Sequence, residues 1–318
     1  MRGICMGRIV EITNPGRSVH KDHGFLAIRE GGQTLGRVPL DDIDAVIAAS
    51  QGITWSGTSL TALAERSVPV VFVGKNFAPI AHILPLAAHH NQGGIMQAQA
   101  DAKQPVRKRL WADIVRRKIS AQQAALQLYG LESARLAKLK LDVTSGDPDN
   151  REAAAAQYYW RTLFGEDFSR DRVSPGSNIA LNYGYAILRA ATARAIVASG
   201  LNPSLSVHHV SGGDALRLAD DLMEPFRSAI DITVKDMRLG ATDELTPVLK
   251  TELAAVMLAD YATENGRTPL SQVLVRLAQS LARVYLGTDK RLDWPHSDIP
   301  LPVSANDISE ETWDSVLP

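Results

Sequence analysis

Residues 208–227, HHVSGGDALRLADDLMEPFR, hold the side chains of this 318-residue chain that are best suited to metal chemistry. They combine two imidazoles, those of His208 and His209, with three carboxylates, those of Asp220, Asp221 and Glu224. The carboxylates lie on an expected helix from about residue 214 to 226. Carboxylates three or four residues apart share one side of a helix. An imidazole beside convergent carboxylates suits a divalent cation. The segment therefore predicts part of a metal site whose remaining ligand comes from elsewhere in the chain.

Helical geometry divides the residues of this segment between a core face and an acidic face. The apolar residues form one stripe at 100° per residue: Ala215, Leu218, Ala219, Leu222 and Phe226. Asp221 and Glu224 lie off this stripe and about 60° apart. Solvation, or pairing with Arg217 and Arg227, is the simpler interpretation of Asp220 or Asp221 taken alone. Pro225 places Glu224 near a bend or a helix end. The tandem histidines point in different directions, so at most one of them is expected to bind the metal directly.

Residues 149–164, DNREAAAAQYYWRTLF, offer Glu152 as the further ligand. If Asp149 is the N-cap, Glu152 stands at N3 and completes a capping box, which would occupy its side chain. If Asp147 is the cap and the following proline stands at N1, Glu152 lies inside the helix and is available. The Asp-Pro pair favours the second frame, but both remain open at this stage.

The net charge of −1 conceals two regions of opposite charge. Residues 103–140 contain ten basic side chains against Asp113 and Glu132, near +8, whereas residues 214–236 are near −3. A basic band beside an acidic cluster suggests a phosphate backbone held near a metal, although a solvated helix face is an equal interpretation. The candidates for contact with DNA are Arg107, Lys108, Arg109, Arg116, Arg117 and Lys118.

Composition and motifs narrow the class of protein. The single cysteine, Cys5, excludes an intramolecular disulfide and a cysteine-only zinc site. We expect a cytoplasmic protein with no membrane segment, because the start lacks a signal-peptide core and the densest apolar run, residues 68–73, is too short to cross a bilayer. The motifs of zinc peptidases, P-loop NTPases and serine hydrolases (HExxH, GxxxxGK[ST] and GxSxG) do not occur.

The chain is expected to be an α+β protein with a β-rich domain followed by a larger helical one. We expect a β-rich domain over residues 1–85, a linker over 86–104, a helical catalytic domain over 105–290 and an extended tail over 291–318. In the first domain, strands are expected at residues 7–13, 24–29, 41–48 and 68–73, a helix at 58–66, and a hairpin turn at Gly31-Gly32. In the second, long helices are expected at 107–128 and 177–199.

Four segments together resemble one family. They are GRIVEI with TWSGTSLTALAERSVPVVFVG, then REAAAAQYYWRTLFG, then NIALNYGYAILRA, and finally GLNPSLSVHHVSGGDALRLADDLMEPFR. Their order and spacing are similar to those of the CRISPR-associated spacer-acquisition endonuclease and integrase ("Cas one"), in the form found with type II systems. The resemblance covers essentially the whole chain.

The resemblance implies a β-sandwich-like N-terminal domain, an all-helical C-terminal domain and a site for Mg²⁺ or Mn²⁺. By motif, its ligands are Glu152, His209 and Glu224; His209 is chosen over His208 by its spacing of fifteen residues from Glu224. His208 and Asp221 are accessory candidates. The implied reaction inserts short double-stranded DNA into a CRISPR array by attack of a 3′-hydroxyl on a phosphodiester. The implied partners are a second copy of the chain in a homodimer, a dimer of a small protein ("Cas two"), and the RNA-guided effector nuclease.

Two other functions fit the residues. In a non-catalytic DNA-binding scaffold, Glu152 would be a helix cap and the acids would be solvated, so no metal-dependent cleavage or joining would occur. A stand-alone nuclease of the same fold, acting on branched DNA in repair, would be encoded without CRISPR neighbours.

Overall fold

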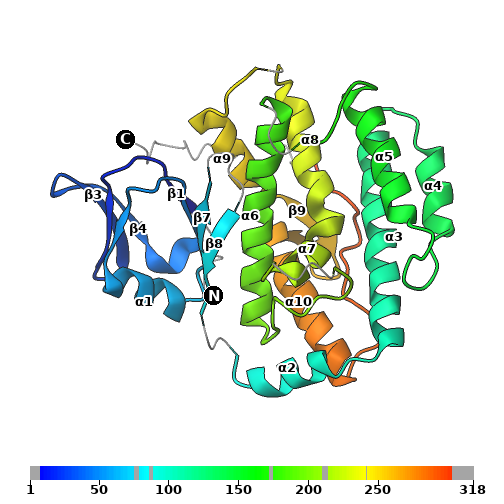
Figure 1. Ribbon diagram of the computed structural model, residues 1–318, viewed down its shortest axis with the longest axis horizontal. Coiled ribbons are helices and arrows are strands. Elements are labelled where there is room, and N and C mark those ends of the chain that lie inside the picture. Colours follow the sequence, from blue (N-terminus) through cyan, green and yellow to red (C-terminus); the bar gives the residue numbers. More distant parts are fainter. Residues whose placement is uncertain are drawn as a thin grey trace. The chain divides into compact units, whose positions relative to one another are not determined.

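The computed structural model describes residues 8–74, 79–85, 89–171, 175–209, 214–240 and 242–302 (Figure 1). Residues 8–74 and 79–85 belong to one compact unit, and the described residues from 89 to 300 belong to a second. The first unit is β-rich and the second is mainly helical, as expected from the sequence. None of the described helices is both long and apolar enough to cross a membrane.

The β-rich unit contains two four-stranded sheets in its described residues. One has the order β1-β5-β7-β8 and the other β4-β3-β2-β6. The strands are β1 (Arg8–Ile12), β2 (Ser18–Asp22), β3 (Phe25–Glu30), β4 (Gln33–Pro39), β5 (Ile43–Ala48), β6 (Thr54–Trp55), β7 (Val70–Val73) and β8 (Pro79–Ile83), with the 3-10 turn η1 (Leu40–Asp42) before β5. β1, β5 and β7 are parallel, and β8 closes the first sheet antiparallel to β7. The expected Gly31-Gly32 turn is confirmed: both glycines have positive φ, and Glu30 pairs with Gln33 across it.

Both sheets and α1 (Gly57–Glu65) share one apolar core. Ile12 and Val46 contribute from the first sheet, Val19 and Leu26 from the second, and Leu63 from the helix; all are almost fully buried. The Ser56 side chain caps α1 by accepting a hydrogen bond from the Ser59 amide at 3.2 Å. The shared core agrees with the sandwich-like arrangement expected for this part of the chain.

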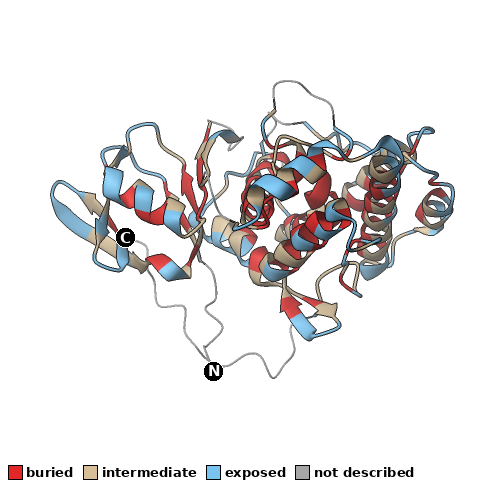
Figure 2. Ribbon diagram, turned by 90° about the horizontal axis from the view of Figure 1, so that it is seen from below, coloured by how far each residue is buried: buried red, intermediate tan, exposed pale blue. Residues whose placement is uncertain are grey.

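Within the helical unit, the long helix α6 (Ser177–Ala198) is almost wholly buried, and other helices pack around it; buried residues are drawn in red in Figure 2. Its elements are α2 (Gln92–Ala100), α3 (Gln104–Leu128), α4 (Ala134–Leu141), α5 (Arg151–Phe164), α6 (Ser177–Ala198), α7 (Arg217–Met223), the 3-10 turn η2 (Glu224–Phe226), α8 (Arg227–Met237), α9 (Pro247–Ala255), the 3-10 turn η3 (Val256–Leu258), β9 (Asp260–Thr263), β10 (Gly266–Pro269) and α10 (Leu270–Leu286). α6 packs against α7, α8, α9 and α10, and α3 packs against α4, α5 and η2.

Three features of this unit differ in detail from the expectations. Within the expected linker, Gln92–Ala100 forms a helix, because the buried Gln99 side chain bonds the backbone of Asn202 and Leu205 despite the neighbouring glycines. The unit is not all-α, since β9 and β10 form an antiparallel hairpin. Residues 291–300 of the expected tail are bonded to α3 and β9: Trp294 Nε1 donates to Asp113 Oδ2 at 2.8 Å, and the His296 amide donates to the Ala262 carbonyl at 2.7 Å. Residues 303–318 lie outside the described part.

The close approach of α6 to its neighbours depends on Gly184. A Cβ atom at this position would lie 2.4 Å from Ile230 Cγ2 on α8 and 3.3 Å from Leu253 Cδ2 on α9. Gly93 on α2 has no heavy atom near the corresponding position. The two glycines therefore form a matched pair, one without space for a side chain and one with it.

We expect Gly184→Ala to lower the free energy of unfolding by about 1–3 kcal/mol, since the helices must separate to admit the methyl group. Gly93→Ala should leave the free energy unchanged or raise it by less than about 1 kcal/mol. Urea denaturation followed by far-UV circular dichroism measures both. Equal stability of the two variants would show that α6 and α8 can separate freely.

Candidate metal centre

Helix α5 presents Glu152 in its first turn without using it as a cap. The Asp147 carboxylate accepts hydrogen bonds from the amides of Arg151 and Glu152, both at 3.0 Å. Asn150, in the left-handed conformation, is the N-cap residue and contributes no side-chain bond. Asp147 therefore caps the helix, as the second alternative expected, but Asn150 occupies the N-cap position and the helix begins at Arg151 rather than at Pro148. The side chain of Glu152 is not used as a cap.

A buried lysine joins Glu152 to Glu224. Lys118 Nζ, which comes from α3, donates to Glu152 Oε1 and lies 2.5 Å from Glu224 Oε2. The side chains of Lys118 and Glu224 are only 11% and 7% exposed. Burial would lower the pKa of Lys118, but the charges of Glu224 and Glu152 outweigh this effect and raise it. The predicted role of Lys118 as a surface contact for DNA is therefore wrong: its ammonium group is a cation held between two of the predicted ligands.

Glu224 stands at the junction between two helices, as Pro225 predicted. α7 ends at Met223, residues 224–226 form η2, and α8 begins at Arg227. Arg227 Nη2 lies 2.9 Å from Glu224 Oε1. Burial would raise the pKa of Glu224, but Arg227 and Lys118 lower it below its ordinary value, so the carboxylate is ionised. The apolar stripe behind it is confirmed for Leu218, Ala219, Leu222 and Phe226, which are buried. Ala215, the fifth predicted member, is exposed, because α7 starts at Arg217 rather than near residue 214.

Asp221 orients His209 and does not face a free ligand position. Its side chain is 0% exposed, which contradicts the solvated interpretation. One of its oxygens accepts from the amides of Val207 and His208 at 2.6 and 3.0 Å. The other lies 2.5 Å from His209 Nδ1. Because Nδ1 is engaged, Nε2 is the nitrogen of His209 that is available for a metal, an arrangement common at metal sites.

A cavity of about 170 Å³ brings both histidines beside Glu152. The other residues that line it are Trp111, Asp147 and Asn150. The His208 ring stacks on the Trp111 indole, with a centroid separation of 4.3 Å and an angle of 6° between the planes. His209 meets the same indole edge-on. His208 is thus held as a wall of the cavity, whereas His209 is held through its Nδ1 atom.

The chemistry of Glu152, His209 and Glu224 fits a hard divalent cation, but the two carboxylates are paired with the ammonium group of Lys118. Glu224 Oε2 is buried and has no hydrogen-bond partner with acceptable geometry, although Lys118 Nζ is close. Within the described residues, no three histidine, cysteine or acidic side chains are close enough together to bind a metal as they stand. A cation site formed by Glu152, His209 and Glu224 therefore requires Lys118 to withdraw from between the carboxylates.

Asp220 has a structural partner that the sequence did not predict. Arg189 of α6 bonds both Asp220 oxygens at 2.8 Å and also bonds Asp214 at 2.5 and 2.6 Å. The predicted pairing of this acidic face with Arg217 does not occur for Asp220. Residues 210–213 lie outside the described part of the chain. Arg189 holds Asp214, the residue that follows them, and Asp221 holds residues 207–209, which precede them.

The expected basic band is largely engaged within the protein. Arg107 donates to the carbonyls of Gln99 and Ala100, and Arg116 donates to that of Val143. Arg117 bonds Asp298 and lies over the Trp294 ring. Lys108 and Arg109 are exposed, as is Arg116 despite its bond. Contact between these exposed side chains and DNA stays a prediction.

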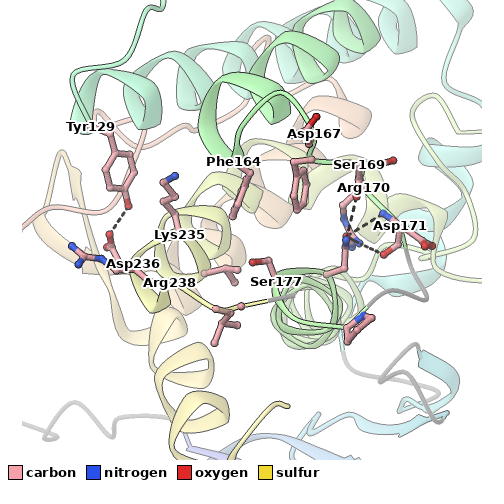
Figure 3. A pocket seen from close by; sticks show the side chains of 16 residues that line it. Tyr129, Phe164, Asp167, Ser169, Arg170, Asp171, Ser177, Lys235, Asp236 and Arg238 are labelled. Carbon is pink, nitrogen blue, oxygen red and sulfur yellow. Dashed lines mark hydrogen bonds between the residues drawn. The ribbon is translucent and has the colours of Figure 1, made fainter. Parts of the chain in front are cut away.

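A larger cavity, of about 1380 Å³, lies near the other end of α5 (Figure 3). Phe164, Arg170, Lys235 and Asp236 are among its lining residues, and none of the predicted metal ligands is. Arg170 is held by Asn178 and Asn182, at 2.9 and 2.7 Å. Size alone would favour this cavity as the active site, but Glu152 and both histidines line the smaller one.

The family model for the CRISPR-associated protein Cas1 matches residues 10–240. The chain is also 39% identical over 246 residues to the CRISPR-associated endonuclease Cas1 of Neisseria meningitidis, covering 76% of this chain and 80% of that protein. The chain belongs to the Cas1 family. The family identified from the sequence is therefore confirmed, and Glu152, His209 and Glu224 lie within the matched region.

Solved structures show the Cas1 fold in this chain. A casposase bound to its integration product superposes with a TM-score of 0.77 at 20% identity, covering 95% of this chain and 97% of the casposase. A Cas6-RT-Cas1–Cas2 complex gives a TM-score of 0.71 at 18% identity, covering 92% of this chain and 36% of the matched one. At these identities the similarity establishes the fold.

Several residues around this candidate site were not predicted from the sequence. They are Trp111, Tyr159, Arg189 and Asp231, together with the paired role of Lys118. Most of them act through tertiary contacts between elements distant in sequence. One signal was available in the spacing. Tyr159 stands seven residues after Glu152, so both lie on the same face of one helix. Asp231 likewise stands seven residues after Glu224.

The tandem histidines should titrate on opposite sides of the ordinary histidine value. Burial lowers the pKa of His208, whereas the hydrogen bond to Asp221 raises the pKa of His209. In metal-free protein, NMR titration of the ring protons should show His209 holding its proton to higher pH than His208. Asp221→Asn removes the negative charge that stabilises the imidazolium, so the His209 pKa should fall while that of His208 stays below the ordinary value. An unchanged His209 pKa in this variant would contradict the assigned role of Asp221.

Proposed function

We propose that this chain is a DNA endonuclease and integrase of CRISPR adaptation that depends on Mg²⁺ or Mn²⁺. The supporting observation is the convergence of Glu152 and Glu224 on one buried cationic group, with His209 and Glu152 lining the same cavity. These carboxylates are separated by 72 residues and come from different elements. Two acids without a cationic partner would repel at such a place, and their pairing around the positive charge of Lys118 supports the proposal that a metal cation can take its position.

The residues of the site would divide the work between binding and orientation. Glu152, His209 and Glu224 would hold the ion, and Asp221 would keep the imidazole turned with Nε2 toward it. A bound Mg²⁺ or Mn²⁺ would polarise the scissile phosphodiester and stabilise the negative charge that develops on it. Oxygen ligands with one imidazole suit both ions, and the nitrogen favours Mn²⁺ somewhat.

The joining reaction exchanges one phosphodiester for another. The 3′-oxygen of the inserted fragment forms a bond to phosphorus, the bond to the 3′-oxygen of the target strand breaks, and the proton of the attacking hydroxyl ends on solvent or on the released 3′-oxygen. The number of phosphodiester bonds is unchanged, so no nucleotide triphosphate is needed. With water as the nucleophile, the same arrangement would cleave DNA.

Partners of this chain would set the length and the position of the inserted DNA. We infer a homodimer that assembles with a dimer of Cas2 and works with the RNA-guided effector nuclease. The similarity of the fold to a chain of a Cas6-RT-Cas1–Cas2 complex supports the Cas2 partner. The exposed Lys108, Arg109 and Arg116 are the candidates for contact with the phosphate backbone, which is independent of sequence.

Removal of any predicted ligand should abolish strand transfer while leaving the fold and DNA binding intact. We expect Glu152→Ala, His209→Ala and Glu224→Gln each to lower the joining rate more than about a hundredfold, because the ion loses a direct ligand. An integration assay with Cas2 and Mn²⁺ measures this, and electrophoretic mobility shift measures DNA binding. Asp149→Ala is the control, since this acid also lies beside the start of α5 but is exposed. Full activity of the Glu224→Gln variant would refute the assignment.

Replacement of Lys118 should affect the metal-free and metal-bound protein in opposite ways. Lys118→Met leaves two carboxylates facing each other, so the metal-free protein should lose about 1–3 kcal/mol of unfolding free energy. Mn²⁺ should bind this variant more tightly and raise its Tm more than that of the parent, because no ammonium group competes. Thermal unfolding with and without Mn²⁺ measures both effects, and Lys108→Met on the same helix is the control. Unchanged Mn²⁺ affinity would show that Lys118 does not occupy the position of the ion.

A further inference from the structure

Another buried carboxylate, Asp231, lies on the helix that follows Glu224 and η2. Asp231 on α8 is 2% exposed. Its Oδ2 accepts a hydrogen bond from the Tyr159 hydroxyl of α5 at 3.0 Å, and its Oδ1 accepts one from the Tyr185 hydroxyl of α6. One side chain of α8 is therefore bonded to two other helices of the unit.

This arrangement is costly for a core position. Burial of a carboxylate carries a large desolvation penalty, and apolar residues of similar volume would often be as stable or more stable. Its two recorded bonds come from neutral hydroxyl groups, and burial raises the pKa of Asp231 to about 7. A contribution to geometry explains such a group better than a contribution to stability.

The bonds of Asp231 link the two chain segments that carry the acidic ligands. Tyr159 stands two helical turns after Glu152 on α5, about 10 Å along the axis. Asp231 stands two turns after Glu224, on the helix that begins directly beyond η2. The Tyr159–Asp231 bond therefore links α5 to α8 two turns beyond each of the two carboxylates.

Tyr185 adds a second connection to Glu224. Its ring lies beneath the Arg227 guanidinium, 4.9 Å from the ring centroid, and Arg227 in turn binds Glu224 Oε1 at 2.9 Å. Arg170 approaches the same ring at 5.5 Å. The hydroxyl bond to Asp231 fixes this ring, so Asp231 also controls the position of the cation that holds Glu224.

We propose that Asp231 is a positioning residue that sets the separation of Glu152 and Glu224 through Tyr159 and Tyr185. The inference rests on the proposed function, because the separation matters only if both carboxylates bind one ion. Its loss should weaken metal binding without removing any ligand.

The test measures Mn²⁺ affinity directly, with Mn²⁺ alone as the probe. Electron paramagnetic resonance of free Mn²⁺ gives the Kd of the full-length protein and of the Asp231→Asn, Tyr159→Phe and Glu224→Gln variants. We expect Asp231→Asn and Tyr159→Phe each to weaken Mn²⁺ binding about tenfold, as is typical for residues that orient metal ligands. Circular dichroism verifies folding, and if Asp231→Asn does not fold, Tyr159→Phe, which keeps the carboxylate, decides the question.

Tyr129→Phe is the matched control. The Tyr129 hydroxyl also bonds an aspartate of α8, Asp236, at 2.8 Å, and the Ile232 carbonyl at 3.1 Å. Among the described residues, neither Tyr129 nor Asp236 has a hydrogen bond or ion pair with Glu152, Glu224 or Lys118. This variant should lose some thermal stability and keep the Mn²⁺ affinity of the parent. A merely structural role for Asp231 would predict the same behaviour for both tyrosine variants.

The outcomes separate this inference from the proposed function. If Glu224→Gln abolishes Mn²⁺ binding but Asp231→Asn and Tyr159→Phe stay within twofold of the parent, Asp231 is not a positioning residue and the metal centre stands. An effect of Tyr129→Phe as large as that of Tyr159→Phe would also overturn the inference. If the parent protein does not bind Mn²⁺, or Glu224→Gln binds it unchanged, the proposed metal centre and this inference both fail.

Discussion

The mutual repulsion of Glu152 and Glu224 is the constraint on which the helical unit depends. Two carboxylates from distant elements share one place, and one of them is buried, so positive charge must accompany them. Lys118 and Arg227 supply that charge from α3 and from the start of α8. The metal-free protein thus keeps its acidic side chains together. Exchange of the lysine for a metal would change the charge of the site rather than its framework.

The framework around these charges is held by polar groups as well as by apolar packing. Asp147 fixes the start of α5, Asp221 fixes the backbone at residues 207–209, and Asp231 ties α8 to α5 and α6. Each of these aspartates uses its carboxylate to satisfy amides or hydroxyl groups that neighbouring segments present. Such bonds are directional, so they specify distances that an apolar core of the same volume would leave less well defined.

Sequence patterns predicted those features that local geometry determines. The apolar stripe of α7, the break at Pro225 and the two-glycine hairpin follow from helical periodicity, from the proline ring and from turn stereochemistry. The identity of each partner did not follow from them. Lys118 looked like one member of a basic band because periodicity assigns a residue to a face but does not show what opposes that face. Asp221 looked solvated for the same reason, and Gln92–Ala100 looked like a linker because the contacts of Gln99 are made about one hundred residues away.

The stack of His208 on Trp111 gives the cavity an optical reporter of its own. The indole lies flat against one imidazole and edge-on to the other, at the wall that Glu152 shares. Excited indole transfers an electron readily to a protonated imidazole, so the emission of Trp111 depends on the charge of the ring beside it. Occupation of this cavity, by an ion or by DNA, should therefore be visible in the intrinsic fluorescence of the unlabelled protein.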